Sequence, residues 1–457
     1  MFVNNWNCLL FYSQFQITIF MKYSFWCLFL LTGAKWAIAQ TQTDSTLVSP
    51  DLQQCIQYAL RHQPAVQQAV IDEQLAETTI RTKLADWYPQ VNMNYLAQHN
   101  FQVQTSVIGG NPVRLGVANT SSLQFGLTQQ IFNRDVLLAA RTKTDIRLQA
   151  KQNTSANKID VAANVSKAFY DIVATRQQIR VNEENLTRIN RSLQDAYNQY
   201  KAGIADKTDY KRASITQNNT KANLQSAYVL LKAKEEYLKY LMGYPTNQPL
   251  QISYDSLQME RELNTDTLLT ARVQDRIEYK QLETQQRLLE ANLKYERWGY
   301  LPSLSLNGNY NMMFLNEEIS KLYSTNYPNS YAGLTLGLPL FQGGKRKARI
   351  EAATWQLKRI ELDKISFSNS VNAEYNQAMA AYKSSYANYL ALKENLALAH
   401  EVYDVINLQY RSGVKTYLEV IVAETDLRSA EINYYNSLNE VLSAKIDVQR
   451  SLGQINY

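Results

Sequence analysis

Tyr200-Lys201-Ala202-Gly203 is followed 210 residues later by Tyr410-Arg411-Ser412-Gly413. The same offset of 210 separates Gly243 from Gly453, and each of these glycines stands 40 residues after the glycine of its tetrapeptide. Landmarks that recur in one order at a constant spacing indicate an internal repeat. We therefore interpret the chain as a tandem duplication of a unit of about 210 residues.

Helix-breaking residues are scarce and confined to a few places. The 457 residues include only 15 glycines and 9 prolines, below the usual shares of about 7% and 5%. No proline occurs between Pro112 and Pro245, or after Pro339. Long uninterrupted helices are therefore expected, the longest of them roughly 100 Å at 1.5 Å per residue. The predicted long helices are 134–201 and 345–411, with return helices over 206–242 and 415–452.

One of these helices carries an aromatic stripe. Its members follow one another at steps of seven residues: Tyr375, Tyr382, Tyr389, Leu396, Tyr403 and Tyr410. Apolar or small residues fill the companion positions, with Ser385 as the exception. A sustained seven-residue repeat predicts a coiled-coil seam. We assign these tyrosines to packing and not to a ligand site.

Two pairs of short segments alternate between apolar and polar residues, which is the period of a strand. These strands are predicted near 89–101, 120–131, 302–313 and 331–340, with surface loops at 102–119 and 316–330. Their polar faces carry Asn, Ser, Thr and Gln and almost no charge, as in membrane barrels. A half-buried soluble sheet is the alternative. Four strands are too few to close a barrel in lipid, whereas three copies of the chain would supply twelve.

Residues 1–39 have the three successive regions of a secretory signal peptide. Met21-Lys22 gives a basic start, 25–31 is apolar, and Ala37-Ile38-Ala39 is a cleavage site of small residues. A membrane anchor is the alternative, but seven apolar residues fall short of the roughly 20 that a spanning helix needs. We expect an exported protein whose translation starts at Met21, so that residues 1–20 precede the true start.

Composition excludes several functions. The net charge of +6 comes without a long basic run, so nucleic acid is not an expected partner. Cys55 is the only cysteine after the leader, and His62, His99 and His400 are far apart, so neither a disulfide nor a zinc site is expected. No set of acid, base and nucleophile has catalytic spacing. We expect no cofactor, no metal and no enzymatic activity.

In addition to the duplication, two short motifs characterise the chain. One is the strand-to-helix segment Gly337-Leu338-Pro339-Leu340-Phe341-Gln342-Gly343-Gly344, and the other is the turn Tyr410-Arg411-Ser412-Gly413-Val414-Lys415. With them, the chain resembles the TolC family of bacterial outer membrane factors over essentially its whole mature length. The first repeat departs from the pattern at Gln129-Gln130-Ile131-Phe132-Asn133-Arg134, which lacks the proline and the glycines.

The resemblance implies a mainly α fold with a small β part. It implies a homotrimer that forms a twelve-stranded β-barrel in the lipid of the outer membrane and a coiled-coil α-helical tunnel in the periplasm. The first repeat is then 40–243, the connecting equatorial segment 244–266 and the second repeat 267–457.

Such channels pass small molecules or secreted polypeptides from an inner-membrane transporter and a periplasmic adaptor to the exterior, in tripartite efflux or type I secretion. They catalyse nothing. Two alternatives are a periplasmic coiled-coil adaptor or scaffold without a barrel and, with less support, an exported enzyme. The adaptor would not explain strand pairs at the same place in both repeats.

The resemblance also places a gate at the two helix turns, which are marked by Gly203 and Gly413. A carboxylate in the first turn and a tyrosine and a basic residue in the second hold the family's tunnel shut. The matching residues here are Asp209 with its neighbour Thr208, and then Tyr410 and Lys415. The alternative for Asp209 and Lys415 is a pair of solvated surface charges.

An acidic ring at the tunnel constriction is the last feature that the resemblance implies. Glu419 matches one ring position, while Val422 stands at a second position that is usually acidic, with Glu424 nearby. A threefold ring of Glu419 would attract cations. An ordinary helix-surface charge is the alternative for this residue.

Overall fold

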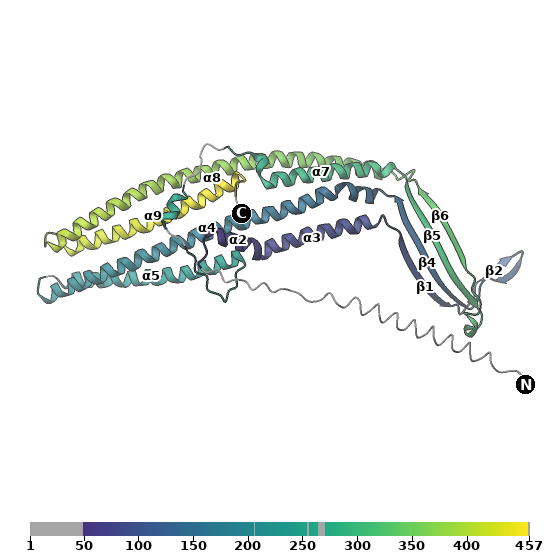
Figure 1. The fold of residues 1–457 in the computed structure, drawn as a ribbon, viewed down its shortest axis with the longest axis horizontal. Helices are drawn as coiled ribbons and strands as arrows, with labels where there is room; N and C mark the ends of the chain where they lie inside the picture. The colour runs from purple at the N-terminus through teal and green to yellow at the C-terminus, as the bar shows by residue number, and fades with distance from the viewer. Residues whose placement is uncertain (1–48, 205, 254–255, 264–269, 456–457) are drawn as a thin grey trace, which may run out of the picture. The chain divides into compact units, whose positions relative to one another are not determined.

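The computed structural model describes residues 49–204, 206–253, 256–263 and 270–455. The predicted signal peptide, residues 1–39, lies outside the described residues. Long helices and one larger sheet dominate the described chain (Figure 1).

In the first repeat, helices precede and follow the strands along the chain. In chain order its elements are α2 (Leu52–His62), α3 (Pro64–Ala85), β1 (Gln90–His99), β2 (Thr105–Ile108), β3 (Asn111–Arg114), β4 (Asn119–Phe132), α4 (Arg134–Lys201) and α5 (Lys207–Met242). A short helix, α6 (Ser256–Arg261), follows in the connecting segment.

The second repeat has the same order of long elements. They are α7 (Ile277–Arg297), β5 (Ser303–Asn316), β6 (Asn329–Gly337), α8 (Lys345–Arg411) and α9 (Tyr417–Ser451), with 3₁₀ turns at η1 (Val273–Asp275), η2 (Trp298–Tyr300) and η3 (Ile319–Lys321). The bounds of the long helices lie within two residues of those predicted, and the strand ends lie within three.

Local chemistry sets several of these bounds. The backbone N–H of Gln54 donates to Asp51 Oδ1 at 2.8 Å, and the N–H of Asp51 donates to Gln54 Oε1 at 3.0 Å, so the two residues cap α2 reciprocally. Asn133 caps α4 by accepting a hydrogen bond from the N–H of Asp135 at 2.7 Å. β6 ends at Gly337, two residues before Pro339, because proline has no N–H for the ladder.

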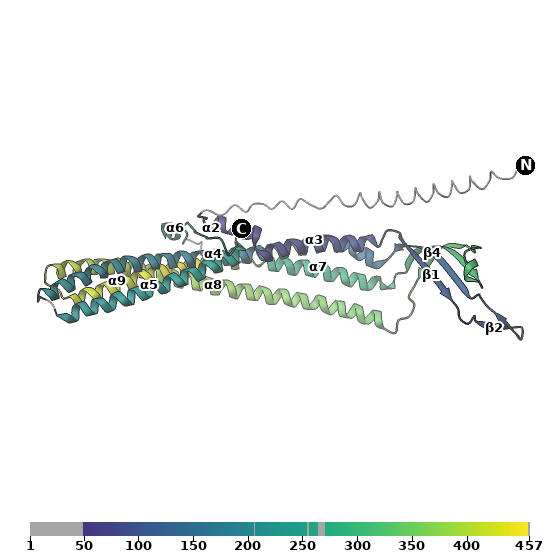
Figure 2. The same cartoon turned by 90° about the horizontal axis from the view of Figure 1, so that it is seen from below.

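Shorter helices pack along successive parts of both long helices. α4 packs against α3 and α7 in one part of its length and against α5 and α9 in another, while α8 packs against α7 and then α9. Figures 1 and 2 show α3 and α7 on the side of the sheet, and α5 and α9 on the side of the helix turns. A helix of 68 residues therefore has lateral partners along its length.

The aromatic stripe of α8 lies in its packed seam. Tyr382 and Tyr389 are buried, and Tyr375, Tyr403 and Tyr410 are half-buried. The ring centroid of Tyr389 is 5.8 Å from that of Tyr434 on α9. The seven-residue repeat therefore predicted the packed side of the helix correctly.

Four strands form one antiparallel sheet in the order β1-β4-β5-β6, so β4 and β5 join the two repeats. Cross-strand pairs keep the two faces separate: Met93 lies opposite Phe125, and Phe125 lies opposite Tyr310. On the other face, Gln124 donates to Asn309 at 2.8 Å. The predicted alternation is confirmed, and one irregularity in register occurs between Gln130 and Phe132.

The predicted surface loop 102–119 is wrong as a description, because it contains a second small sheet. β2 and β3 pair as an antiparallel hairpin around Gly109 and Gly110. These glycines have φ of +61° and +85°, and a two-residue hairpin turn favours residues that accept positive φ at both positions. The Gly-Gly pair between Ile108 and Asn111 was the sequence signal for this hairpin.

Candidate functional site

The helix turns at the end remote from the sheet hold the residues that the sequence singles out (Figure 1). Gly203 has φ of +73°; its N–H donates to Tyr200 O at 3.0 Å, and the next N–H donates to Gln199 O at 2.9 Å. Gly413 has φ of +76° and repeats both bonds, to Tyr410 O and to Gln409 O, each at 2.9 Å. This pair of bonds is the Schellman motif, which satisfies the last carbonyls of a helix and needs a left-handed residue.

Different side chains begin the two return helices. Asp206 Oδ1 accepts hydrogen bonds from the N–H and the hydroxyl of Thr208, each at 2.7 Å, and caps α5. The hydroxyl bond from Thr208, followed by the backbone bond, lowers the pKa of Asp206. Glu419 Oε2 accepts hydrogen bonds from the N–H of Thr416 at 2.9 Å and from its hydroxyl at 3.1 Å at the start of α9. Thr208 and Glu419 therefore both have local roles in capping.

The predicted latch residues have the following partners within the chain. Lys415 Nζ lies 2.6 Å from Glu419 Oε1, one turn along, and the Tyr410 hydroxyl donates to Gln199 Oε1 at 3.3 Å. Burial raises the pKa of Tyr410, and the negative charge of Asp209 adds to that rise. Within the chain, Tyr410 therefore bonds to Gln199, and Lys415 pairs with Glu419.

A small apolar core joins the two turns. Its buried members come from three helices: Ala196 of α4, Ala213 of α5, and Tyr417 and Val420 of α9. Tyr410 packs against this cluster from α8, and its ring centroid lies 5.8 Å from that of Tyr417. The two helical hairpins therefore pack against each other at the tip, beneath a rim that is formed by the two turns.

Glu419 is accessible to solvent at the tip. Its side chain is 39% exposed, and the hydrogen bond from Lys415 is the main cause that lowers its pKa. Val422 is exposed and carries no charge. Glu424 does not substitute for it, because its side chain is buried against α4, where the Ser192 hydroxyl donates to Glu424 Oε1 at 3.4 Å.

Two carboxylates on α9 are buried, which the sequence did not predict for either of them. Glu424 and Glu431 are 3% and 7% exposed and lie seven residues apart. Burial raises the pKa of Glu424 to about 7 and also raises that of Glu431. Arg188 Nη2 of α4 lies 3.6 Å from Glu431 Oε2, and His400 Nε2 of α8 lies 3.8 Å from Glu431 Oε1. A heptad count along α9 would have found both acids.

The described residues do not show a centre for metal or thiol chemistry. They contain no group of three His, Cys, Asp or Glu side chains placed to hold a metal ion. Cys55 is buried in α2, and burial raises its thiol pKa to about 12, which disfavours the nucleophilic thiolate. Among the described helices, none combines the length and apolarity that crossing a membrane requires.

A family model described as outer membrane efflux protein matches residues 55–244 and 274–454, which covers both repeats. The chain belongs to the outer membrane efflux protein family. It is 21% identical over 426 residues to outer membrane protein TolC of Escherichia coli, covering 89% of this chain and 83% of that protein. It is 22% identical over 415 residues to the probable efflux pump outer membrane protein TtgC of Pseudomonas putida, covering 88% and 83% of the two chains.

Solved structures show the same fold. The Campylobacter jejuni CmeC outer membrane channel superposes with a TM-score of 0.72 at 14% identity, covering 88% of this chain and 85% of that one. As an outer membrane efflux protein, the chain lies in the outer membrane and carries a helical tunnel in the periplasm. Proteins of this family are transport channels, are trimeric, and work with adaptors and inner-membrane pumps. The predictions of fold, family and location are confirmed, and the adaptor or scaffold alternative is not favoured.

Proposed function

We propose that three copies of this chain close a twelve-stranded barrel and form the exit duct of an efflux or type I secretion system. The duct passes small molecules or polypeptides passively, receives them from a pump with its periplasmic adaptor, and performs no catalysis. The observation that carries this proposal is the pairing of the sheet. Among the described strands, β1 pairs only with β4 and β6 only with β5, so each has one open edge.

An open strand edge is not tolerated in lipid. Unpaired N–H and C=O groups have no water to bond there, and each one is destabilising by several kcal/mol. Barrels remove this problem by closing the sheet on itself. Pairing β6 of one copy with β1 of the next satisfies both edges, and three copies with four strands each make a closed ring of plausible size.

The faces of the sheet support the same conclusion. Met93 on β1 and Leu334 on β6 are 62% and 65% exposed on the apolar face. Exposed apolar side chains in alternating positions suit contact with lipid, whereas the Asn-rich face suits a water-filled lumen.

Arginine substitutions at neighbouring positions of β6 test the barrel. Leu334→Arg places a charge on the lipid face three residues before the end of β6, where the expected destabilisation of the barrel is smaller than the roughly 2–4 kcal/mol of a mid-bilayer position. Gly333→Arg is the matched control on the opposite face, where an added Cβ meets no atom within 4 Å. We expect Leu334→Arg to reduce trimer in the outer membrane fraction, and Gly333→Arg to retain it and shift ion selectivity towards anions. Recovery of the wild type in the soluble periplasm without detergent would refute the channel.

We propose further that the tip turns gate the tunnel through Asp209, Thr208, Tyr410 and Lys415, with Glu419 at the constriction. The packed core beneath the turns supports this proposal, because it couples both hairpins to any movement of the rim. The Lys415–Glu419 pair supports it as well, since movement of Lys415 would uncover the Glu419 charge. One exposed ion pair contributes only about 0–1 kcal/mol, so an adaptor can release such a latch.

The combined substitution Asp209→Ala and Lys415→Ala tests the gate. We expect a higher single-channel conductance in planar bilayers, because the turns lose two charged groups of the proposed latch and Glu419 loses its counter-charge. The control combines Lys383→Ala with Glu394→Ala, two exposed charges elsewhere on α8, and should leave conductance unchanged. An unchanged conductance in the tip variant would remove Asp209 and Lys415 from the gate.

A further inference from the structure

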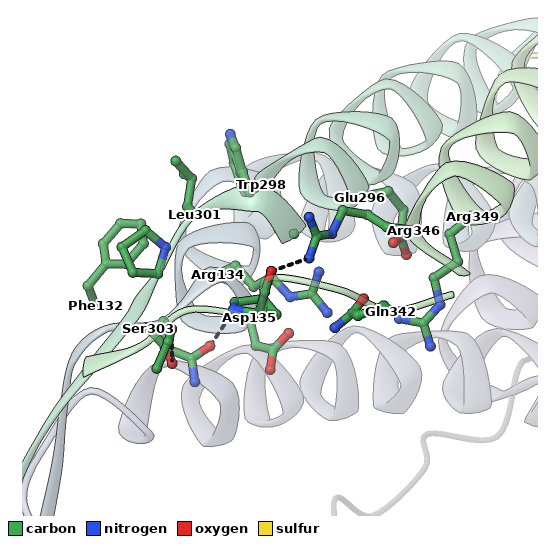
Figure 3. A pocket seen from close by; sticks show the side chains of 15 residues that line it. Phe132, Arg134, Asp135, Glu296, Trp298, Leu301, Ser303, Gln342, Arg346 and Arg349 are labelled. Carbon is green, nitrogen blue, oxygen red and sulfur yellow. Dashed lines mark hydrogen bonds between the residues drawn. The ribbon is translucent and has the colours of Figure 1, made fainter. Parts of the chain in front are cut away.

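A cavity of about 200 Å³ lies where the strands of the second repeat meet the helices. Three arginines line it: Arg134 from the start of α4, and Arg346 and Arg349 from the start of α8. Figure 3 shows their side chains around that of Gln342. Two carboxylates also line the cavity, Asp135 and Glu296. The arginines outnumber the acids, so the cavity has a net positive lining.

Neighbouring groups hold two of these guanidinium groups in place. Arg346 Nη2 donates to Pro339 O at 2.8 Å, and its Cζ lies 4.2 Å from the centroid of the Tyr300 ring. Arg134 Cζ lies 4.4 Å from the centroid of the Tyr295 ring. Arg346 Nε is buried and has no hydrogen-bond partner among the described residues. A buried donor without a partner is destabilising, and a ligand oxygen would satisfy it.

The start of α8 differs from the start of α4 in its charges. α4 has the side-chain cap Asn133 and the acid Asp135 in its first turn. α8 begins after Gly344, has no side-chain cap and no acid in its first turn, and carries four cations in its first five residues: Lys345, Arg346, Lys347 and Arg349. Positive charges near a helix N-terminus repel the helix dipole, and an anion offsets that repulsion.

We propose that this cavity binds the phosphate group of a lipid headgroup at the periplasmic face of the outer membrane. The cavity is smaller than the roughly 300–1,000 Å³ of sites for drug-sized ligands, so it suits a compact anion and not a transported solute. Guanidinium groups recognise phosphate oxygens through paired, charge-assisted hydrogen bonds. The unpartnered Arg346 Nε and the exposed Arg349 supply such donors.

The surroundings of the cavity favour a lipid over a free ion. The cavity lies at the ends of β5 and β6, and Trp298 lines it. The segment that leaves β6 exposes Leu340 and Phe341 at 85% and 89%. Aromatic side chains mark the edges of the membrane in barrels, and apolar ones beside them would contact acyl chains. A headgroup phosphate in the cavity therefore leaves its chains on an apolar surface.

The test uses the full-length protein, purified as a trimer in nonionic detergent without phosphate. The trimer is titrated separately with dihexanoyl phosphatidylglycerol, with the neutral lipid dihexanoylglycerol and with inorganic phosphate. Binding of each is measured by native mass spectrometry. We expect saturable binding of the phosphatidylglycerol at one site per protomer and no saturable binding of the neutral lipid. Arg346→Gln with Arg349→Gln is expected to weaken binding at least about tenfold, which is about 1.4 kcal/mol.

Two further variants keep the test decisive. Arg349→Gln alone changes an exposed side chain and is expected to weaken binding while leaving the fold intact. Arg359→Gln with Lys383→Gln removes the same charge from exposed positions on the same helix and should not affect binding. Unchanged binding in the cavity variants, or equal loss in the control, overturns the proposal. Inorganic phosphate that binds as tightly as the lipid would overturn its assignment to a headgroup. Conductance should be unchanged in all variants, so the result does not depend on the gate.

Discussion

Gly243→Ala is expected to destabilise the protein far more than the same substitution at Gly203. Both glycines end helices in the left-handed conformation, with φ of +66° and +73°. At Gly243 an added Cβ would lie 2.6 Å from His62 O and 2.9 Å from Gln63 Cα. These are backbone atoms at the corner between α2 and α3, so no side chain can rotate away. At Gly203 nothing lies within 4 Å of such an atom.

The two positions therefore separate conformational strain from a steric clash. The left-handed conformation costs a non-glycine residue roughly 1–2 kcal/mol, and both variants should show this loss. Displacing a packed backbone adds about 1–3 kcal/mol, and only Gly243→Ala should show this further loss. Thermal unfolding in detergent, followed by circular dichroism, gives the comparison. Equal shifts of the midpoint in both variants would contradict the close approach of the α5 end to the α2–α3 corner.

The sequence predicted the long helices and the strands because both depend on local chemistry. The scarcity of breakers sets the length of α4 and α8, and alternation sets the two faces of β4 and β5. The four glycines at constant spacing all proved to be helix ends with positive φ: Gly203, Gly243, Gly413 and Gly453. A position that needs a left-handed residue can be identified from sequence when it recurs in a duplicated unit.

The partners of the polar residues at the tip could not be predicted in the same way. The resemblance to the family implied a polar link between Asp209 and Lys415, whereas within the chain Lys415 pairs with Glu419. An i, i+4 pair and a bond between two turns are both compatible with the local sequence. The rotation of each helix about its axis decides between them, and that rotation follows from packing around Tyr417 and Val420.

The burial of Glu424 and Glu431 could not be predicted from the local sequence either. A charged residue at a heptad position is either solvated or buried, and the side chains of the neighbouring helix that face it decide which. Here α4 presents Arg188 and Ser192, and α8 presents His400 and Tyr403. The carboxylates are therefore buried beside a cation, and a buried ion pair of imperfect geometry is weak evidence for stability.

Glu424→Gln is expected to stabilise the helical tip at pH 8. Burial raises the pKa of Glu424 from an ordinary 4.5 to about 7, so the folded protein holds a proton that the unfolded chain releases. The stabilisation from this proton is complete below about pH 4.5 and is lost as the pH rises to about 7. Above that range the free energy of unfolding of the wild type is lower by on the order of 2–3 kcal/mol. The Glu424→Gln variant does not have this loss, because its amide stays neutral. The guanidinium unfolding midpoint should therefore fall between pH 5 and pH 8 in the wild type and change less in the variant.

Glu419→Gln is the matched control on the same helix, and its expected effect has the opposite sign. The hydrogen bond from Lys415 lowers the pKa of Glu419, so this carboxylate stabilises the folded state above its unfolded pKa and loses that effect as the pH falls. Removing its charge should lower the midpoint slightly at pH 8. Arg188 keeps Glu431 as a partner in Glu424→Gln, so the variant does not leave a buried cation alone. A midpoint for Glu424→Gln below that of the wild type at pH 8 would show that ionised Glu424 stabilises the seam through Arg188, and that burial is not the dominant effect.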